Sequence, residues 1–140
     1  MRVVLDTNVL ISAFVFPGGA PEDVVRAALE GRIQMVTSPA LLAEFARVLA
    51  AKFGWDDAHV EAAVALVVRN AELVRPSTPV RVVREDPPDD RVLEAAAEGR
   101  ADAIVSGDRH LRRLGAWEGI AVRGPADLAA TLATRPEGNP

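Results

Sequence analysis

At 140 residues, the chain is long enough for one domain with its own hydrophobic core and too short for two ordinary domains. Hydrophobic residues make up 49% of it and charged residues 26%, which is typical of soluble globular proteins and favours neither a disordered nor a membrane-embedded class. The net charge of −4 disfavours non-specific binding of nucleic acid, so an enzyme acting on nucleic acid would need local positive charge.

The first predicted element is a buried parallel strand, because Val3-Val4-Leu5 form a short continuous apolar run. This run ends in the polar triplet Asp6-Thr7-Asn8, which places Asp6 at the carboxyl end of the strand. After a loop over 16–20, the pattern predicts a helix from Pro21 to about Glu30 and a strand over 33–37. The next predicted helix has Ser38 as its cap and Pro39 at its first position. A further helix is capped by Asp56 and runs to about Asn70.

The second half of the chain continues this alternation of strands and helices. A strand over 72–74 precedes a loop marked by Pro76 and Pro79, and the acidic segment over 86–90 precedes a helix that Gly99 ends. A strand over 103–105, a short helix from Arg109, a strand over 120–122 and a helix over 125–132 complete the prediction. The alternation predicts a parallel α/β sheet with helices on both faces, in which ligands bind outside the carboxyl ends of the strands.

We expect one domain over 1–133 and a disordered tail over 134–140. The longest apolar run, over 62–68, is far shorter than the roughly 20 residues that span a bilayer. The apolar start of the chain runs directly into Asp6, so no signal peptide is visible. The expected location is therefore the cytoplasm, without membrane contact.

Two acidic residues, Asp6 and Asp108, each follow a buried apolar strand. Because the carboxyl ends of parallel strands meet at one edge of the sheet, both side chains are expected to project from the same edge. The alternative is that each carboxylate only caps the helix or turn that follows it.

A third carboxylate, Glu44, has Leu41 three residues before it and Val48 four residues after it. It therefore borders the apolar face of its helix and does not lie on the solvated side. The alternative is a simple ion pair with Arg47.

The fourth candidate carboxylate is Asp89, which has Val92 three residues on and Ala96 seven residues on and is therefore aimed at the buried stripe of its helix. Asp90 shares its face with Glu94 and is interpreted as a first-turn residue that the helix dipole favours. In the alternative interpretation, all the acidic residues of the 86–90 segment only cap the helix.

Four carboxylates gathered together repel one another, by about 3 kcal/mol for two charges ~5 Å apart at an effective dielectric near 20. One or two divalent ions would cancel this repulsion, activate a water and stabilise the leaving oxygen of a phosphoryl displacement. With no cysteine and two histidines, the metal ligands must be mainly oxygen, which favours Mg²⁺ or Mn²⁺. Asn8 and Ser106 are candidates to orient waters or carboxylates, or are ordinary turn residues.

A basic cluster follows Asp108 and is a candidate to bind a phosphate backbone; it consists of Arg109, His110, Arg112 and Arg113. The alternative is a solvated basic helix face. With 4% aromatic residues and no tyrosine, the chain lacks a base-stacking platform of the RRM or OB kind. Neither a Gly-rich phosphate loop nor a nucleophilic serine elbow occurs.

Four motifs together resemble the PIN-domain family, and more narrowly the VapC-like toxins of bacterial and archaeal toxin–antitoxin systems. They are Asp6-Thr7-Asn8, Glu44 in a Ser-Pro-initiated helix, Asp86-Pro87-Pro88-Asp89 and Val105-Ser106-Gly107-Asp108. The resemblance runs from Met1 to about Leu132 and implies a three-layer α/β/α sandwich with a central parallel sheet.

The resemblance also implies an Mg²⁺- or Mn²⁺-dependent endoribonuclease, often a homodimer, inhibited by a small antitoxin whose segment covers the acidic site. Asp6, Glu44, Asp89 and Asp108 match the acidic quartet of the family. Ser106 stands where threonine is common, and a shift of one residue would put Asp90 in the place of Asp89.

The leading hypothesis is hydrolysis of RNA phosphodiesters that leaves a 3′-hydroxyl and a 5′-phosphate. One alternative is an aspartyl phosphotransferase or phosphatase with Asp6 as nucleophile, although Asn8 stands where a dehalogenase-type phosphatase needs a second aspartate. Another alternative is a catalytically silent interaction module, whose acidic pocket receives a basic partner peptide.

Overall fold

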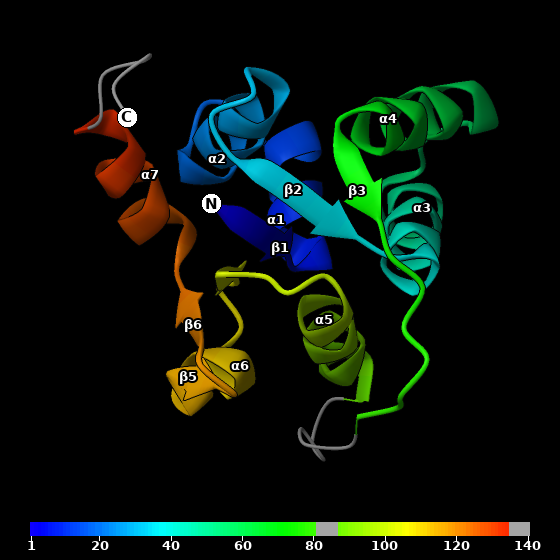
Figure 1. Ribbon diagram of the computed structural model, residues 1–140. Coiled ribbons are helices and arrows are strands. Elements are labelled where there is room, and N and C mark those ends of the chain that lie inside the picture. The colour runs from blue at the N-terminus through cyan, green and yellow to red at the C-terminus, as the bar shows by residue number, and fades with distance from the viewer. Residues whose placement is uncertain (81–86, 135–140) are drawn as a thin grey trace.

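The computed structural model describes residues 1–80 and 87–134, in which helices and strands alternate as predicted (Figure 1). None of the described helices is long and apolar enough to cross a membrane. In chain order the elements are β1 (Arg2–Leu5), α1 (Thr7–Val15), α2 (Ala20–Leu29), β2 (Gln34–Thr37), α3 (Pro39–Phe53), α4 (Asp57–Arg69), β3 (Ala71–Leu73), α5 (Pro87–Glu98), β4 (Ala103–Val105), α6 (Arg109–Leu114), β5 (Ala116–Trp117), β6 (Ile120–Arg123) and α7 (Pro125–Ala133).

The strands form a sheet in the order β3-β2-β1-β4-β6-β5, with β1 near its centre. All neighbours are parallel except β5 and β6, which are antiparallel. Leu5 of β1 is in register with Val105 of β4, and Val4 of β1 with Val36 of β2. The residues that follow these three strands therefore meet at one edge of the sheet.

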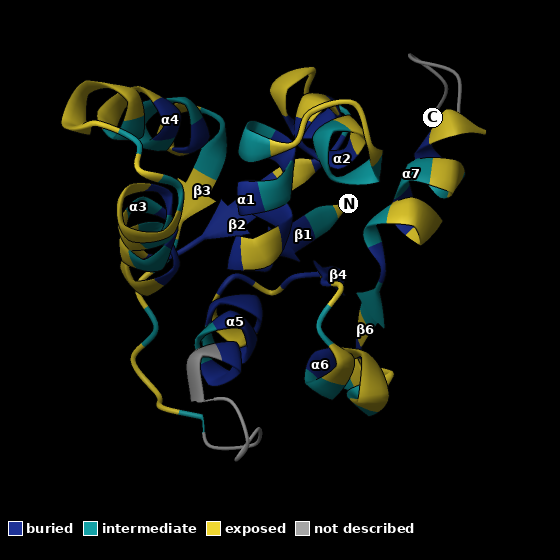
Figure 2. Ribbon diagram, turned by 180° about the vertical axis from the view of Figure 1, so that it is seen from behind, coloured by how far each residue is buried: buried dark blue, intermediate teal, exposed yellow. Residues whose placement is uncertain are grey.

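Helices cover both faces of the sheet, which confirms the predicted three-layer arrangement. Because side chains alternate along a strand, Val3 and Leu5 of β1 enter one core while Val4 enters the other. The first core also takes apolar residues of α1, α2, α3, α4 and α7, and the second takes those of α5 and α6 together with Leu41 of α3. Figure 2 shows the buried strands between α1 and α2 on one side and α5 on the other.

The helix caps predicted for α3 and α4 are present. The Ser38 hydroxyl accepts a hydrogen bond from the Leu41 N–H at 3.3 Å, and the Asp56 carboxylate accepts one from the His59 N–H at 2.8 Å. Each such cap satisfies a backbone donor that the helix itself leaves unpaired. Gly54 ends α3 in the left-handed conformation with φ of 68°, which a residue without Cβ adopts easily.

Two elements were absent from the sequence prediction. Helix α1 begins immediately after Asp6, and its residues are apolar on most sides, so five of its nine positions are buried and no clear helical stripe stands out. Strand β5 has only two residues, which is too short for a detectable alternation.

The expected start of α5 was also wrong in detail, whereas its end at Glu98 was predicted correctly. The helix begins at Pro87, so Asp89 and Asp90 lie in its first turn and not before it; a proline loses no hydrogen bond at that position. Gly99 does not adopt a left-handed conformation; instead Arg100 does, with φ of 51°. A Cβ on Gly99 would lie 2.5 Å from Cγ1 of Val36, so glycine lets the end of α5 approach β2 closely. Asp86 and the tail residues 135–140 lie outside the described residues.

Candidate active site

Asp6 lies in the buried edge where β1 ends. Its N–H donates to the Val105 carbonyl of β4 at 2.9 Å, and the residue is only 5% exposed. Its Oδ2 accepts a hydrogen bond from the Ser106 hydroxyl at 2.7 Å, and its side chain makes no cap to α1. The principal hydrogen bond of the Asp6 carboxylate is thus to Ser106, although the Asn8 N–H of α1 also acts on it.

Burial raises the pKa of Asp6 above its ordinary value, and this effect exceeds the lowering by the Ser106 and Asn8 hydrogen bonds. The negative charges of Asp108 and Glu44 raise this pKa further. A bare carboxylate is thus disfavoured at Asp6, and a cation beside it would relieve both causes.

Asp108 follows β4 and caps α6. Its Oδ1 accepts from the N–H groups of His110 at 2.8 Å and Leu111 at 3.2 Å, so the capping alternative holds for this residue. Its own N–H donates to the Ser106 hydroxyl at 2.9 Å. Ser106 is fully buried and connects both aspartates, which gives it a role beyond that of an ordinary turn residue.

The Asp89 carboxyl group from α5 hydrogen-bonds the Asp108 carboxyl group. Partial burial acts to raise the pKa of Asp108, but this hydrogen bond and those from the Leu111 and His110 N–H groups outweigh it and lower the pKa. Two carboxyl groups this close must share a proton or a cation, because two bare charges would repel. Asp90 lies in the first turn of α5 and is as buried as Asp89, at 5% exposed.

Glu44 joins the site from α3. Its side chain is 29% exposed, and its carboxylate lies 3.5 Å from the Arg47 guanidinium. Its charge also raises the pKa of Asp6, so it faces the aspartates while it pairs with Arg47. The ion pair with Arg47 is confirmed, and a role for Glu44 in the acidic site stays a prediction. A depression of about 360 Å³ lies beside it, lined by Asn8 of α1 and by α3.

The charges of Asp108 and Glu44 act on Asp6, and the Asp89 carboxyl group acts on Asp108. Their oxygen donors and buried negative charge fit a hard divalent cation such as Mg²⁺ or Mn²⁺. Within residues 1–80 and 87–134, however, no group of three or more such side chains is arranged to hold a metal ion. Binding would therefore require these side chains to rotate toward a common point.

Two hydroxyl groups at the same edge escaped the sequence analysis. Thr7 follows Asp6, and Thr37 ends β2; both are buried, and neither Oγ1 has a hydrogen-bond partner within the described part of the chain. Buried polar atoms of this kind mark positions for waters or ligands. The signal for Thr37 is its place at the end of a strand next to β1.

The basic cluster of α6 is divided by the fold. Arg109, Arg112 and Arg113 are exposed, and His110 is half-buried, where its charge would help to lower the pKa of Asp108. The Arg112 guanidinium lies against Gly124 at the junction of β6 and α7 and acts on Asp127. Arg112 is therefore engaged at the junction of β6 and α7, while Arg109 and Arg113 remain exposed.

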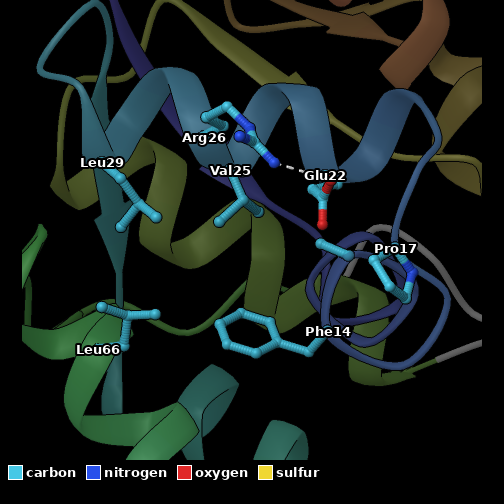
Figure 3. Close-up of a pocket in the computed structure, with 8 residues that line it drawn as sticks. Phe14, Pro17, Glu22, Val25, Arg26, Leu29 and Leu66 are labelled. Carbon is cyan, nitrogen blue, oxygen red and sulfur yellow. Dashed lines mark hydrogen bonds and ion pairs between the residues drawn. The ribbon is translucent and has the colours of Figure 1, made fainter.

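A larger hollow of about 400 Å³ lies away from the acidic residues (Figure 3). It is mainly apolar and is formed by α1, the start of the following loop, α2 and Leu66 of α4. Glu22 and Arg26 form an ion pair at its rim, at 3.0 Å. None of the four candidate carboxylates lines it, so size alone does not identify the reactive site.

Comparisons with known proteins agree with this geometry. The PIN domain family model matches residues 2–110. An uncharacterized protein of Methanocaldococcus jannaschii is 30% identical over 115 residues, which cover 79% of this chain and 73% of that protein. Among solved structures, VapBC2 from Rickettsia felis, bound to a DNA fragment from its promoter, is similar with a TM-score of 0.63 and 12% identity, covering 89% of this chain and 98% of that chain. FitAcB from Neisseria gonorrhoeae is similar with a TM-score of 0.55 and 14% identity, over the same shares of the two chains, 89% and 98%.

Proposed function

The chain belongs to the PIN-domain family, and from that premise we propose that it is a divalent-metal-dependent endoribonuclease, the toxin of a toxin–antitoxin pair. The observation that carries this proposal is the burial of Asp6 and Asp89 near Asp108, with the Ser106 hydroxyl hydrogen-bonded both to Asp6 and to the Asp108 N–H. Such an arrangement of acids is unfavourable without a proton or cation between them.

In this proposal Asp6, Glu44, Asp89 and Asp108 hold one or two Mg²⁺ or Mn²⁺ ions. Bound there, the ions would supply an activated water and stabilise the leaving oxygen of the phosphodiester. Ser106 orients the Asp6 carboxylate through its hydrogen bond, and the α6 N–H groups fix one oxygen of Asp108. Asn8 and Asp90 are further candidates to orient these ligands.

The proposed partners are RNA as substrate, a small antitoxin protein, and a second copy of this chain in a homodimer. The resemblance of the four motifs to VapC-like toxins supports the antitoxin. The fold similarity to VapBC2 and FitAcB agrees with such a toxin.

One alternative is favoured by a specific observation. Because no three carboxylates in the described residues converge on a metal position, the acidic edge could instead receive a basic partner peptide without catalysis. Calorimetric titration separates the two, since a silent module would not bind Mn²⁺. The phosphotransferase alternative is disfavoured, because Asp6 Oδ2 is buried and engaged by Ser106.

The test is cleavage of RNA by the purified protein with Mg²⁺ or Mn²⁺, and with EDTA. We expect cleavage that EDTA abolishes and that Asp6→Asn and Asp89→Asn each reduce by about 100-fold or more. Asp57→Asn, at an exposed position of α4, is the matched control and is expected to cleave normally. Full activity in EDTA, or in both site variants, would refute the proposal.

A further inference from the structure

Helix α6 holds Asp108, but it is too short to hold its own place. It has six residues, and helices of this length do not persist in water without packing against other elements. The N–H groups of His110 and Leu111 in its first turn donate to the Asp108 carboxylate. The position of this carboxylate therefore depends on what anchors α6 to the rest of the fold.

Two side chains of α6 serve as anchors. Leu111 is fully buried in the second core, but apolar contact has no direction and does not fix how the helix is turned. The other anchor is Arg112, whose guanidinium lies over Gly124, the residue between β6 and α7. A Cβ built on Gly124 would lie 2.6 Å from Nη1 and 3.2 Å from Cζ of Arg112.

Gly124 is glycine for the sake of this contact. Its backbone has φ of −78° and ψ of 156°, which any residue adopts, so conformational freedom is not what the position requires. It is also the N-cap of α7, where a serine or aspartate would stabilise the helix and glycine provides no side-chain acceptor. What glycine provides here is the space that the Arg112 guanidinium occupies.

Asp127, in the first turn of α7, gives the guanidinium a fixed negative partner. Its carboxylate accepts a hydrogen bond from Nε of Arg123 at 2.8 Å, and Arg123 also donates to the Thr131 hydroxyl at 2.6 Å. The hydrogen bond from Arg123 lowers the pKa of Asp127, and the positive charge of Arg112 lowers it further. Arg112 is thus attracted to a carboxylate that β6 and α7 already hold.

The same junction supports the loop from β4 to α6 at its other end. The Ser106 N–H donates to the Arg123 carbonyl at 2.9 Å, and α6 lies beside β6 (Figure 1). Asp108 lies between these two points of support. We propose that Arg112 is a positioning residue, which packs on Gly124 opposite Asp127 and so fixes α6 and the Asp108 carboxylate at the acidic edge.

This role differs from the phosphate binding for which the basic cluster is a candidate. The consequence for metal binding rests on the proposed function, in which Asp108 is a ligand. The anchoring of α6 does not rest on it, because all the contacts involved are within the protein. The two parts therefore need separate measurements.

Amide hydrogen exchange without metal, followed by NMR, tests the anchoring. Arg112→Ala should speed exchange of the His110 and Leu111 N–H groups by about tenfold and leave the amides of β1 unchanged. Gly124→Ser should do the same to α6, because its Cβ displaces the guanidinium, while its hydroxyl caps α7 and keeps that helix protected. Arg112→Lys retains the charge opposite Asp127 and should restore protection to within about threefold of the wild type.

Calorimetric titration with Mn²⁺, in the absence of RNA, tests the effect on the site. Arg112→Ala should weaken binding by about tenfold, as loss of a supporting contact does at other metal sites. Removal of a positive charge would by itself strengthen the binding of a cation, so weaker binding reports the position of Asp108. Arg113→Ala removes the same charge from the next residue of α6 and is the matched control, which should bind Mn²⁺ at least as tightly as the wild type.

Wild-type exchange at α6 in Arg112→Ala would overturn the inference, as would an equal loss of Mn²⁺ affinity in Arg113→Ala. Fast exchange of α7 in Gly124→Ser would also contradict it, because the effect would then come from α7 and not from Arg112. A wild-type protein that binds no Mn²⁺ would instead contradict the proposed metal centre, and the exchange rates would still decide whether Arg112 anchors α6.

Discussion

Ser106 joins the two aspartates that follow β1 and β4 at the centre of the candidate site. Its hydroxyl donates to Asp6 and accepts from the Asp108 N–H, at 2.7 Å and 2.9 Å. The two carboxyl groups nevertheless have opposite tendencies. Burial raises the pKa of Asp6, whereas at Asp108 the hydrogen bonds overcome partial burial and lower the pKa. One side chain thus resists negative charge and the other favours it, within one hydrogen-bonded unit.

Variants at Asp108 separate its capping role from its charge. Asp108→Ala loses the acceptor for the His110 and Leu111 N–H groups and should destabilise the fold by about 1 kcal/mol, or lower Tm by about 3 °C. Asp108→Asn keeps an acceptor oxygen and should melt close to the wild type. Both variants should lose Mn²⁺ binding. Thermal denaturation followed by circular dichroism checks this, and equal losses of Tm in the two variants would contradict the capping role.

At the scale of helices and strands, most elements could be predicted from local sequence patterns. The prediction differs from the structure where packing between elements determines the conformation. Strands β1, β2 and β4 are short apolar runs in the sequence. The residue types and positions of Ser38 and Asp56 predict the helix caps that they form. Helix α1 could not be recognised, because burial on several sides removes the amphipathic stripe. The constraint on Gly99 is also invisible in sequence, since it comes from Val36 in a distant strand.

Gly99→Ala tests the close approach of α5 to β2. A Cβ at this position would meet Cγ1 of Val36 at 2.5 Å and the Ala95 carbonyl oxygen at 3.1 Å. We expect a loss of about 1–3 kcal/mol in the free energy of unfolding, as for other overpacked sites. Gly107→Ala, where an added Cβ meets nothing within 4 Å, is the control and should change stability little. Chemical denaturation in urea measures the free energy of unfolding of both variants. An unchanged free energy of unfolding in Gly99→Ala would show that α5 can shift away from β2.

Across the whole molecule, the topology explains why four acids far apart in the sequence gather at one edge. Asp6 and Asp108 could be placed from sequence, because Asp6 directly follows β1 and Asp108 comes three residues after the end of β4 in the same parallel sheet. Glu44 and Asp89 could be selected from helix periodicity. The contact between Asp89 and Asp108 and the division of the α6 cluster could not be predicted, since they depend on side-chain packing between separate elements.

The pH dependence of metal binding follows from the raised pKa of Asp6. Because the folded state holds this proton more tightly than the unfolded state, the contribution of Asp6 to stability falls as pH rises from the ordinary carboxyl value of 3.8 through the raised one. A divalent cation competes with the same proton, so the gain in Tm from Mn²⁺ should be larger at neutral pH than at an acidic pH where Asp6 keeps its proton. Asp6→Asn should show a small gain at every pH. A gain that is equal at both pH values, or equal in the variant, would contradict this account.

The most direct measurement is anomalous diffraction from crystals soaked in Mn²⁺. The account predicts one or two manganese peaks at the carboxyl edge of the sheet, within coordination distance of Asp6, Asp89 and Asp108, with these side chains rotated toward the ion. The peaks should be absent from crystals of Asp89→Asn. Well-ordered crystals without a peak at this edge, or with manganese bound only elsewhere, would contradict the claim that these carboxylates form a metal centre.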